Sequence, residues 1–558
     1  MLIEPKAQAF VDTARSAVCI VGAGPAGITL ALSLARRGVD TVLIESGGRR
    51  MDRRIQSLAD AAELDERRHA PMHVATQRAW GGASRIWGGR CLPLDPIDFE
   101  PTALRGGARW PIAYTELARY YPEACRFALC GMNAFTMQEV FGAFARPLVP
   151  GLADGEVICS SLERWSLPTD FGAVYEEEVR ASRHLRAFLG LTCVSLNFDG
   201  GRDCLSSVTA RSIDGRQLTA QARHFVLAAG GLETTRILMD SDSVHPGGVG
   251  NHADMLGRYY MGHVSGKIAD VQFTAPQDQT IYGFDRDSEG VFCRRRFVIS
   301  PAAQRDRGLS NCALWLDNPP MWKASHHNGI LSLGYLALRI PGLSTRLAPE
   351  AIRRAIVENP GTSSLNSHLW NVVSDLPRAV AFVVPFIWRR YLAHRKLPGF
   401  FVQSSSNRYA LHYHGEHLPN SQSRVCLGTQ RDPLGLRRLR IDIRYSEADV
   451  DSVRRTHELI DRHLSKLDVG YLEYQYGDAS QAIRDQAKDG IHQIGTTRMS
   501  LRAEDGVVDA NCRVHGVRNL FVASSSVFPT SGQANPTLTI VALALRLADH
   551  LRGELTLS

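Results

Sequence analysis

The apolar residues at the start of the chain follow a strand, turn, helix, strand order. Residues 17–21 (AVCIV) form a continuous apolar run, and residues 28–38 (ITLALSLARRG) carry apolar side chains at helical spacing. Residues 41–45 (TVLIE) form a second apolar run. Two apolar strands separated by one helix predict a strand–helix–strand unit near the N-terminus.

The pattern changes further along the chain. Residues 191–230, 265–300 and 400–445 alternate apolar or β-branched residues with polar ones, which predicts antiparallel sheet. The other predicted segments are an extended loop at 71–100, a helix at 110–130, a mostly helical region at 302–395, an amphipathic helix at 447–467, and a final strand and helix within 491–558.

A glycine motif lies between the first strand and the first helix. It runs Gly22-Ala23-Gly24-Pro25-Ala26-Gly27 and fits GxGxxG. Glycines at these positions allow a tight turn and let the backbone approach a pyrophosphate at the helix N-terminus. Glu45 ends the second strand, where a carboxylate accepts from a ribose hydroxyl. The motif predicts a dinucleotide site but does not separate FAD from NAD.

The most specific block lies at the C-terminal end. It begins with HQIGTTRM at His492 and continues to a strand, NLFVASSS, and the segment GQANPTLT around Asn535. These residues resemble the glucose-methanol-choline (GMC) oxidoreductase family, and within it the pyranose 2-oxidase branch. The resemblance extends over essentially the whole chain. Residues 80–90 (WGGASRIWGGR) are similar to the second flavin-binding segment of that family.

The resemblance implies an FAD-dependent oxidation of a CH–OH group in a sugar, glycoside or other polyol. His492 matches the catalytic histidine, which takes the hydroxyl proton while hydride goes to flavin N5. Asn535 matches its partner and is expected to donate a hydrogen bond to the substrate oxygen. Asn535 and Pro536 also predict a capped helix start. The alternatives are an apolar or sterol-like alcohol as substrate, or a non-redox flavoprotein lyase.

FAD is the expected cofactor, held by three distant stretches of chain. The expected cofactor-binding residues are Gly22, Gly24, Pro25, Ala26, Gly27, Glu45, Ser46, Gly81, Gly82, Ser84, Arg85, Val194, Ala229, Gly230, Ser525, Asn535, Pro536 and Thr537. Some relatives bond flavin covalently through a histidine at the position that matches Ile86. Because isoleucine cannot form that bond, we expect the FAD to be non-covalently bound.

These segments predict an α/β fold, α+β overall, in which a Rossmann-like FAD-binding domain is interleaved with an antiparallel-sheet substrate domain. Length alone, 558 residues, favours three or four domains. The motif positions reduce this to two. We expect the FAD-binding domain at 1–105, 185–265 and 490–558, and the substrate domain at 106–184 and 266–489.

The composition also predicts a cellular compartment and limits the classes of partner. Eleven cysteines stand singly without a CxxC pair, which favours reduced thiols and a cytoplasmic location. The net charge of +7 is interpreted as a general surface property, with no nucleic-acid partner. Residues 379–388 (AVAFVVPFIW) are expected to form a buried or lid helix, so membrane contact is possible but not favoured. Oxygen, a quinone or another carrier accepts the electrons, and the oligomeric state stays open.

Other candidate residues are assigned structural roles. His412, His414 and His417 suggest a metal site, but strand alternation does not bring all three to one face, so no metal is expected. One of them could line the substrate pocket. His263 is interpreted as structural, and residues 294–296 (RRR) are interpreted as a solvated strand face.

Overall fold

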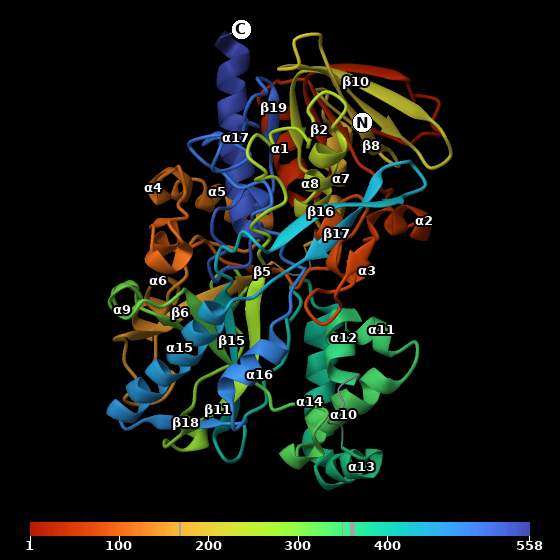
Figure 1. Ribbon diagram of the computed structural model, residues 1–558. Helices are drawn as coiled ribbons and strands as arrows, with labels where there is room; N and C mark the ends of the chain where they lie inside the picture. The colour runs from red at the N-terminus through yellow and green to blue at the C-terminus, as the bar shows by residue number, and fades with distance from the viewer. Residues whose placement is uncertain (167–168, 349, 358–362, 558) are drawn as a thin grey trace.

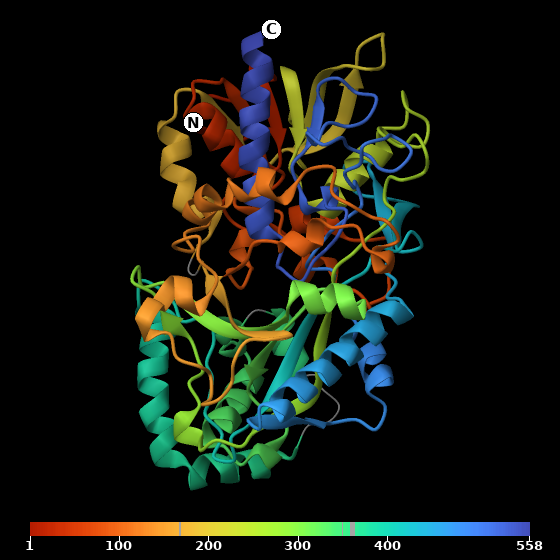
Figure 2. The same cartoon turned by 90° about the vertical axis from the view of Figure 1, so that its left-hand side faces the viewer.

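The computed structural model describes residues 1–166, 169–348, 350–357 and 363–557. The molecule is elongated, with one sheet at each end of its long axis (Figure 1). In the view of Figure 2, the C-terminal helix lies over the upper sheet, and a group of helices lies at the lower end.

The upper sheet has the strand order β1-β7-β3-β2-β10-β9-β8, and β19 pairs with β10. Its strands are β1 (Leu2–Ile3), β2 (Thr13–Val21), β3 (Thr41–Ile44), β7 (Leu185–Phe188), β8 (Thr192–Phe198), β9 (Leu205–Arg211), β10 (Gln217–Leu227) and β19 (Leu520–Val522). β2, β10 and β19 run parallel, whereas β8 and β9 are antiparallel. β10 therefore lies between β2 and β19, so that strands from the beginning, the middle and the end of the chain are neighbours in one sheet.

Two apolar helices cover this sheet. α1 (Pro25–Ala35) packs on α17 (Thr537–Leu557), and all but the first residue of α1 are buried. α17 also packs on α5 (Tyr121–Ala128). Ten residues of α1 are buried, and they lie on all sides of the helix. This explains why the sequence of α1 is apolar around its whole circumference.

The lower sheet has the order β18-β11-β15-β14-β13-β6-β5, with β12 on β13. Its strands are β5 (Arg90–Cys91), β6 (Val157–Trp165), β11 (His263–Phe273), β12 (Asp285–Arg286), β13 (Phe292–Ile299), β14 (Cys312–Asp317), β15 (Arg408–Glu416) and β18 (Gly470–Tyr474). α15 (Glu447–Lys466) and α16 (Ala479–Gln486) pack against it. A third sheet joins β16 (Arg424–Arg431), β17 (Arg437–Asp442) and β4 (Glu63–Leu64).

The remaining helices connect these sheets. They are α2 (Arg53–Gln56), α3 (Met72–Ala75), α4 (Tyr114–Ala118), α6 (Met137–Phe141), α7 (Phe171–Ala181), α8 (Gly231–Asp240) and α9 (Pro301–Arg307). A helical lobe stands beside the lower sheet (Figure 1) and consists of α10 (Gly329–Arg339), α11 (Ser344–Leu347), α12 (Glu350–Val357), α13 (Leu365–Ser374), α14 (Leu376–Ile387) and the π-helical turn Trp388–Leu392.

The structure confirms the mixed α/β fold and corrects several local predictions. The segment 71–100, predicted as extended loop, contains α3 and short 3-10 turns. The arginines 294–296 are not a solvated face: Arg295 and Arg296 are buried, and Arg294 is partly buried and pairs with Glu163. Arg296 donates to Gln533 at 2.7 Å. Residues 379–388 are not a buried helix, because most of their large side chains face outward.

The contacts also bear on where the two domains meet. β5 pairs with β6 in the lower sheet, although residues 90–91 fall in the stretch that we assign to the FAD-binding domain. Conversely, α5 and α7 pack on α17 and α1 of the upper half. We propose that the FAD-binding domain includes α5 and α7 and excludes β5.

Candidate active site

A left-handed glycine turn connects β2 to α1. Gly22 has φ +105°, and a Cβ added to it would lie 2.5 Å from the carbonyl oxygen of Ala228 on the neighbouring chain segment. Only glycine fits this position without strain. The segment 80–90 packs on the same turn, because a Cβ on Gly82 would lie 2.9 Å from Cα of Gly24. The two glycine segments therefore form one surface.

Glu45 fixes the turn from the adjacent strand. Its Oε2 accepts from the main-chain N–H of Ala23 at 2.7 Å, and its Oε1 accepts from that of Gly47 at 2.8 Å. Burial raises the pKa of Glu45 to about 7, against the lowering effect of these two hydrogen bonds. The carboxylate thus holds the turn in shape and faces the cavity beside it.

A cavity of about 1060 Å³ runs from this turn to the C-terminal block. The expected site residues that line it are Gly22, Gly24, Pro25, Ala26, Glu45, Ser46, Gly82, Ser84, Arg85, Ala229, Gly230, His492, Ser525, Asn535, Pro536 and Thr537. Gly27, Gly81 and Val194 do not line it. Gly27 packs on the turn, and Gly81 packs on the start of α7. In β8 the residue that lines the cavity is Cys193 rather than Val194, because neighbouring side chains of a strand point to opposite faces.

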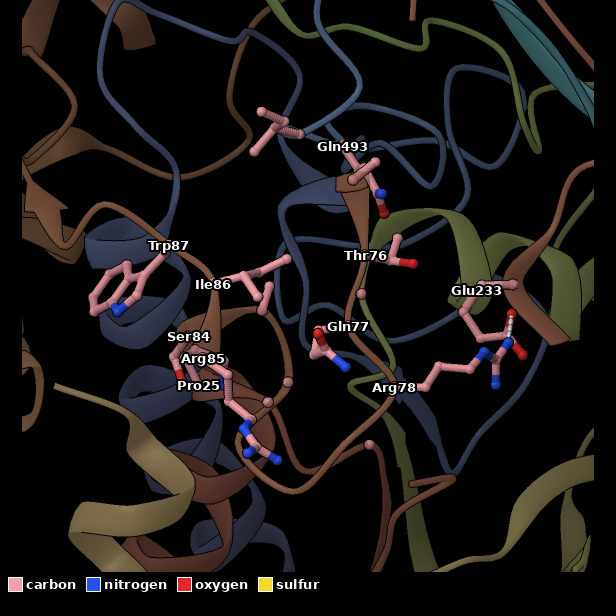
Figure 3. Close-up of a pocket in the computed structure, with 18 of the residues that line it drawn as sticks. Pro25, Thr76, Gln77, Arg78, Ser84, Arg85, Ile86, Trp87, Glu233 and Gln493 are labelled. Atoms are coloured by element: carbon pink, nitrogen blue, oxygen red, sulfur yellow. Dashed lines mark ion pairs between the residues drawn. The ribbon is translucent and has the colours of Figure 1, made fainter. Parts of the chain in front are cut away.

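The loop 84–87 and an ion pair lie along this cavity (Figure 3). Ser84 Oγ donates to the carbonyl of Gly81 at 2.6 Å and accepts from Phe171 N, so its hydroxyl is engaged within the protein. Arg78 pairs with Glu233 at 2.5 Å and donates to Ser46 Oγ at 3.0 Å. The sequence analysis missed both members of this pair.

The residues present fit FAD. A Cβ on Gly24 would meet no atom within 4 Å, so the backbone there is open to the cavity. At the other end Asn535 Oδ1 is buried and has no hydrogen-bond partner among the described residues. Asn535 therefore does not cap α17, contrary to the expected helix start, and its free acceptor points to a bound group. The N-terminus of α17 lies beside it.

His492 lies between an amide and a carboxylate. Its Nε2 lies 3.0 Å from Nδ2 of Asn535, and its Nδ1 lies 3.1 Å from Oδ2 of Asp489. Asp489 Oδ1 also accepts from the main-chain N–H of Ile491 and of His492. The loop is fixed to the upper half by Ser525 Oγ, which donates to the carbonyl of Gln493 at 2.7 Å.

Two further histidines pack against this group. His263 Nδ1 lies 2.9 Å from His492 Nδ1, and the main-chain N–H of His263 donates to Asp489 Oδ2 at 2.7 Å. The ring of His414 stacks on that of His263 at 4.2 Å, and its Nδ1 contacts the carbonyl of Gln533. His263, expected to be structural, thus touches the predicted catalytic residue.

Burial sets opposite charge states in this cluster. It lowers the pKa of His263 to about 4 and lowers that of His414 well below its ordinary value. Burial alone would raise the pKa of Asp489, but its contacts with His492 and His263 lower it well below the usual range. The site therefore combines two neutral imidazoles with one ionised carboxylate.

The three histidines of HYHGEH do not converge. His412 stacks on Trp315 at 4.5 Å, His414 faces His263, and His417 stacks on Tyr445. Ring nitrogens of His263, His414 and His492 do lie within 4.8 Å of one another. Because Asp489 and Asn535 already engage both nitrogens of His492, we assign no metal to this group.

Sequence reasoning could have found part of this cluster. Asp489 stands three residues before His492 in the same loop, a spacing close enough for a shared turn. His263 and His414 carry no local signal, because they reach His492 only through the pairing of β11 with β15. Their role depends on tertiary structure.

The fold and the cavity define an FAD-dependent oxidoreductase, and comparisons with known proteins agree. Residues 419–544 match the family model of GMC oxidoreductases, and residues 15–57 match that of an FAD binding domain. The chain is 24% identical to paromamine 6'-oxidase of Streptomyces fradiae over 96% of this chain and 91% of that protein. It is 22% identical to the fructose dehydrogenase large subunit of Gluconobacter japonicus, with 98% and 99% covered.

Formate oxidase of Aspergillus oryzae has a similar fold, with a TM-score of 0.52, 16% identity, and 98% of this chain and 99% of that chain covered. Residues 419–544 of this chain carry the GMC oxidoreductase C-terminal domain, and the chain is an FAD-dependent alcohol oxidoreductase. The resemblance found in the sequence is confirmed at the level of the family; the pyranose 2-oxidase branch stays a prediction.

Proposed function

We propose that this enzyme oxidises a CH–OH group of a sugar, glycoside or other polyol, with His492 as the base. The observation that supports this most is the pair formed by His492 Nε2 and Asn535 Nδ2, which both line the cavity. An alcohol oxygen that lies against both nitrogens from the cavity would donate its proton to His492 and accept a hydrogen bond from Asn535. This arrangement is what proton removal from an alcohol requires.

Asp489 sets the tautomer of His492. An ionised carboxylate accepts a hydrogen bond, so the Nδ1 proton of His492 is held toward Asp489 and Nε2 is left free as a base. The same carboxylate stabilises the imidazolium that forms when Nε2 takes the proton. His263 stays neutral beside it, which avoids two cationic rings in contact.

When bound, FAD would supply the acceptor for the hydride of the substrate carbon. The Gly22–Gly24 backbone and the N-terminus of α1 would hold its pyrophosphate. The N-terminus of α17, at the other end of the cavity, would supply positive potential to the ring system. Ile86 lines the cavity at the position of the covalent histidine, so we propose dissociable FAD. Acid precipitation should release all of the yellow colour, and colour retained in the pellet would exclude this.

The substrate class is supported by relatives and by the lining. Two similar proteins are named as a paromamine 6'-oxidase and the large subunit of a fructose dehydrogenase, and both named substrates are polyhydroxylated molecules. Thr76 and Gln77 also line the cavity, and each keeps a side-chain oxygen that can accept a hydrogen bond, whereas the amide of Gln493 is already paired with Leu232 and Gly490. These two oxygens favour a polyol, which can donate to them, over a sterol-like alcohol.

The test is anaerobic mixing of the holoenzyme with a panel of sugars, aminosugars, polyols and lipidic alcohols. We expect polyhydroxylated compounds to bleach the flavin absorbance. Bleaching by lipidic alcohols alone would show that the substrate is an apolar alcohol and not a polyol. Turnover of a compound with no bleaching would indicate a lyase.

A further inference from the structure

An apolar surface covers the outer side of the helical lobe. Ten large side chains on α13, α14 and the turn that follows are each 46–70% exposed. We call them the apolar stripe: Leu365, Leu369, Trp370, Val373, Leu376, Val380, Val384, Ile387, Trp388 and Leu392. Several recur three or four residues apart, so they lie along one side of each helix.

α14 is apolar on both of its sides. Ala379 and Phe382 pack inward against Ile330 and Leu331 of α10. The outward side carries the stripe, where a helix facing water normally carries charged residues. A contiguous exposed apolar patch on a folded protein indicates a contact surface.

The same region carries most of the net charge of the protein. Residues 339–400 contain nine Lys and Arg but three Asp and Glu, a net charge of +6 out of +7 for the whole chain. The positive charge is therefore concentrated, not spread along the chain as the composition suggested. Arg389, Arg395 and Lys396 adjoin the end of the stripe and form no ion pair with any carboxylate in the part of the chain that the structure describes.

We propose that the helical lobe docks on an anionic lipid bilayer. The apolar stripe enters the boundary of headgroups and acyl chains, and the arginines and lysine contact lipid phosphates. Trp370 and Trp388 are the aromatic residues that such an interface favours. Two copies of this chain that met through the same face would bring two strongly positive surfaces together, which disfavours a symmetric dimer here.

The lobe lies on the bilayer rather than crossing it. Among the described residues no single helix is long and apolar enough to span a membrane, and the pair α13 and Leu376–Leu392 passes only jointly, with a bend of 89° between the two. The same lobe also lines the cavity, through Arg346, Leu347, Arg390 and Tyr391. Docking therefore brings the part of the lobe that lines the cavity close to the lipid.

Vesicle flotation of the FAD-loaded enzyme tests this proposal. We expect binding to phosphatidylcholine vesicles that contain phosphatidylglycerol, weaker binding to phosphatidylcholine alone, and release by salt. The double variant Val380→Glu/Val384→Glu and the double variant Arg389→Glu/Lys396→Glu should each lower binding about tenfold or more. The matched control is Leu501→Glu, because Leu501 is 63% exposed but lies outside the lobe.

Unchanged flavin absorbance and melting temperature will show that the variants are folded. Absence of wild-type binding to the anionic vesicles would overturn the proposal, as would equal loss in Leu501→Glu. A soluble oligomer that Val380→Glu/Val384→Glu dissociates would also overturn it and would assign the stripe to a subunit interface. Sedimentation equilibrium without vesicles makes that distinction.

Discussion

The two ends of the cavity are built in different ways. At the dinucleotide end the backbone makes the surface, and the residues that shape it lie within short motifs: Gly22, Gly24 and Glu45. At the catalytic end the side chains of His492 and Asn535 line the cavity, and they come from two separate segments. Behind them His492 contacts Asp489 of its own loop and His263 of the distant strand β11.

This difference shows in how each end is stabilised. The dinucleotide end relies on the absence of side chains, so that chain segments can approach one another closely. The catalytic end relies on hydrogen bonds between buried titratable groups, whose charges depend on each other. Changes at the first end should affect cofactor binding, and changes at the second should affect chemistry while leaving the cofactor in place.

The largest effect is expected for Gly22→Val. The new side chain would overlap the backbone at Ala228 and force a β-branched residue to φ +105°. We expect the purified protein to lack FAD and to unfold at lower temperature, measured by absorbance and calorimetry. Gly24→Ala is the matched comparison, because its Cβ meets no protein atom; it should fold normally and bind FAD more weakly. A Gly22→Val protein with full FAD content would contradict this description of the turn.

A smaller effect is expected for Asp489→Asn. The amide cannot hold the Nδ1 proton of His492 or stabilise the imidazolium, so flavin reduction by a saturating substrate should slow by about 10- to 100-fold. FAD content and the substrate dissociation constant should stay near wild type, because Asp489 does not line the cavity. An equal loss of affinity and rate would instead indicate a collapsed loop.

The smallest effect is a change in pH dependence for His263→Gln. Burial lowers the pKa of His263 to about 4, below its ordinary value of 6.5. Its contribution to stability is therefore fully present above pH 6.5 and is lost as the pH falls through about 4. The unfolding free energy of the variant should fall less than that of wild type over this interval, by on the order of 3 kcal/mol at most. Denaturant titrations at pH 7 and pH 5 measure both unfolding free energies, and an equal fall in variant and wild type would refute this.

The sequence predicts the dinucleotide end well and the catalytic end only in part. Gly22, Glu45 and Gly82 belong to local motifs whose spacing reflects backbone geometry, and the structure brings all three to one cavity. His492 and Asn535 were identified through resemblance, and they lie in contact. His263 was assigned a structural role, because strand pairing between distant segments leaves no trace in a single sequence.

The same reasoning explains the errors at the surface. The run of three arginines is withdrawn from water by contacts with distant segments: Arg294 pairs with Glu163 and lies over Trp315, and Arg296 donates to Gln533. Alternation alone does not reveal such contacts. The apolar segment 379–388 was expected to be a buried or lid helix, since hydrophobicity is the usual sign of a core. The structure leaves most of its large side chains exposed.

The rate of flavin bleaching under anaerobic conditions, compared between wild type and His492→Ala, tests the central claim most directly. With a saturating alcohol substrate we predict rapid bleaching in wild type and a rate about 100- to 10,000-fold lower in the variant, at equal FAD content. Bleaching of the variant at the wild-type rate would contradict the assignment of His492 as the base.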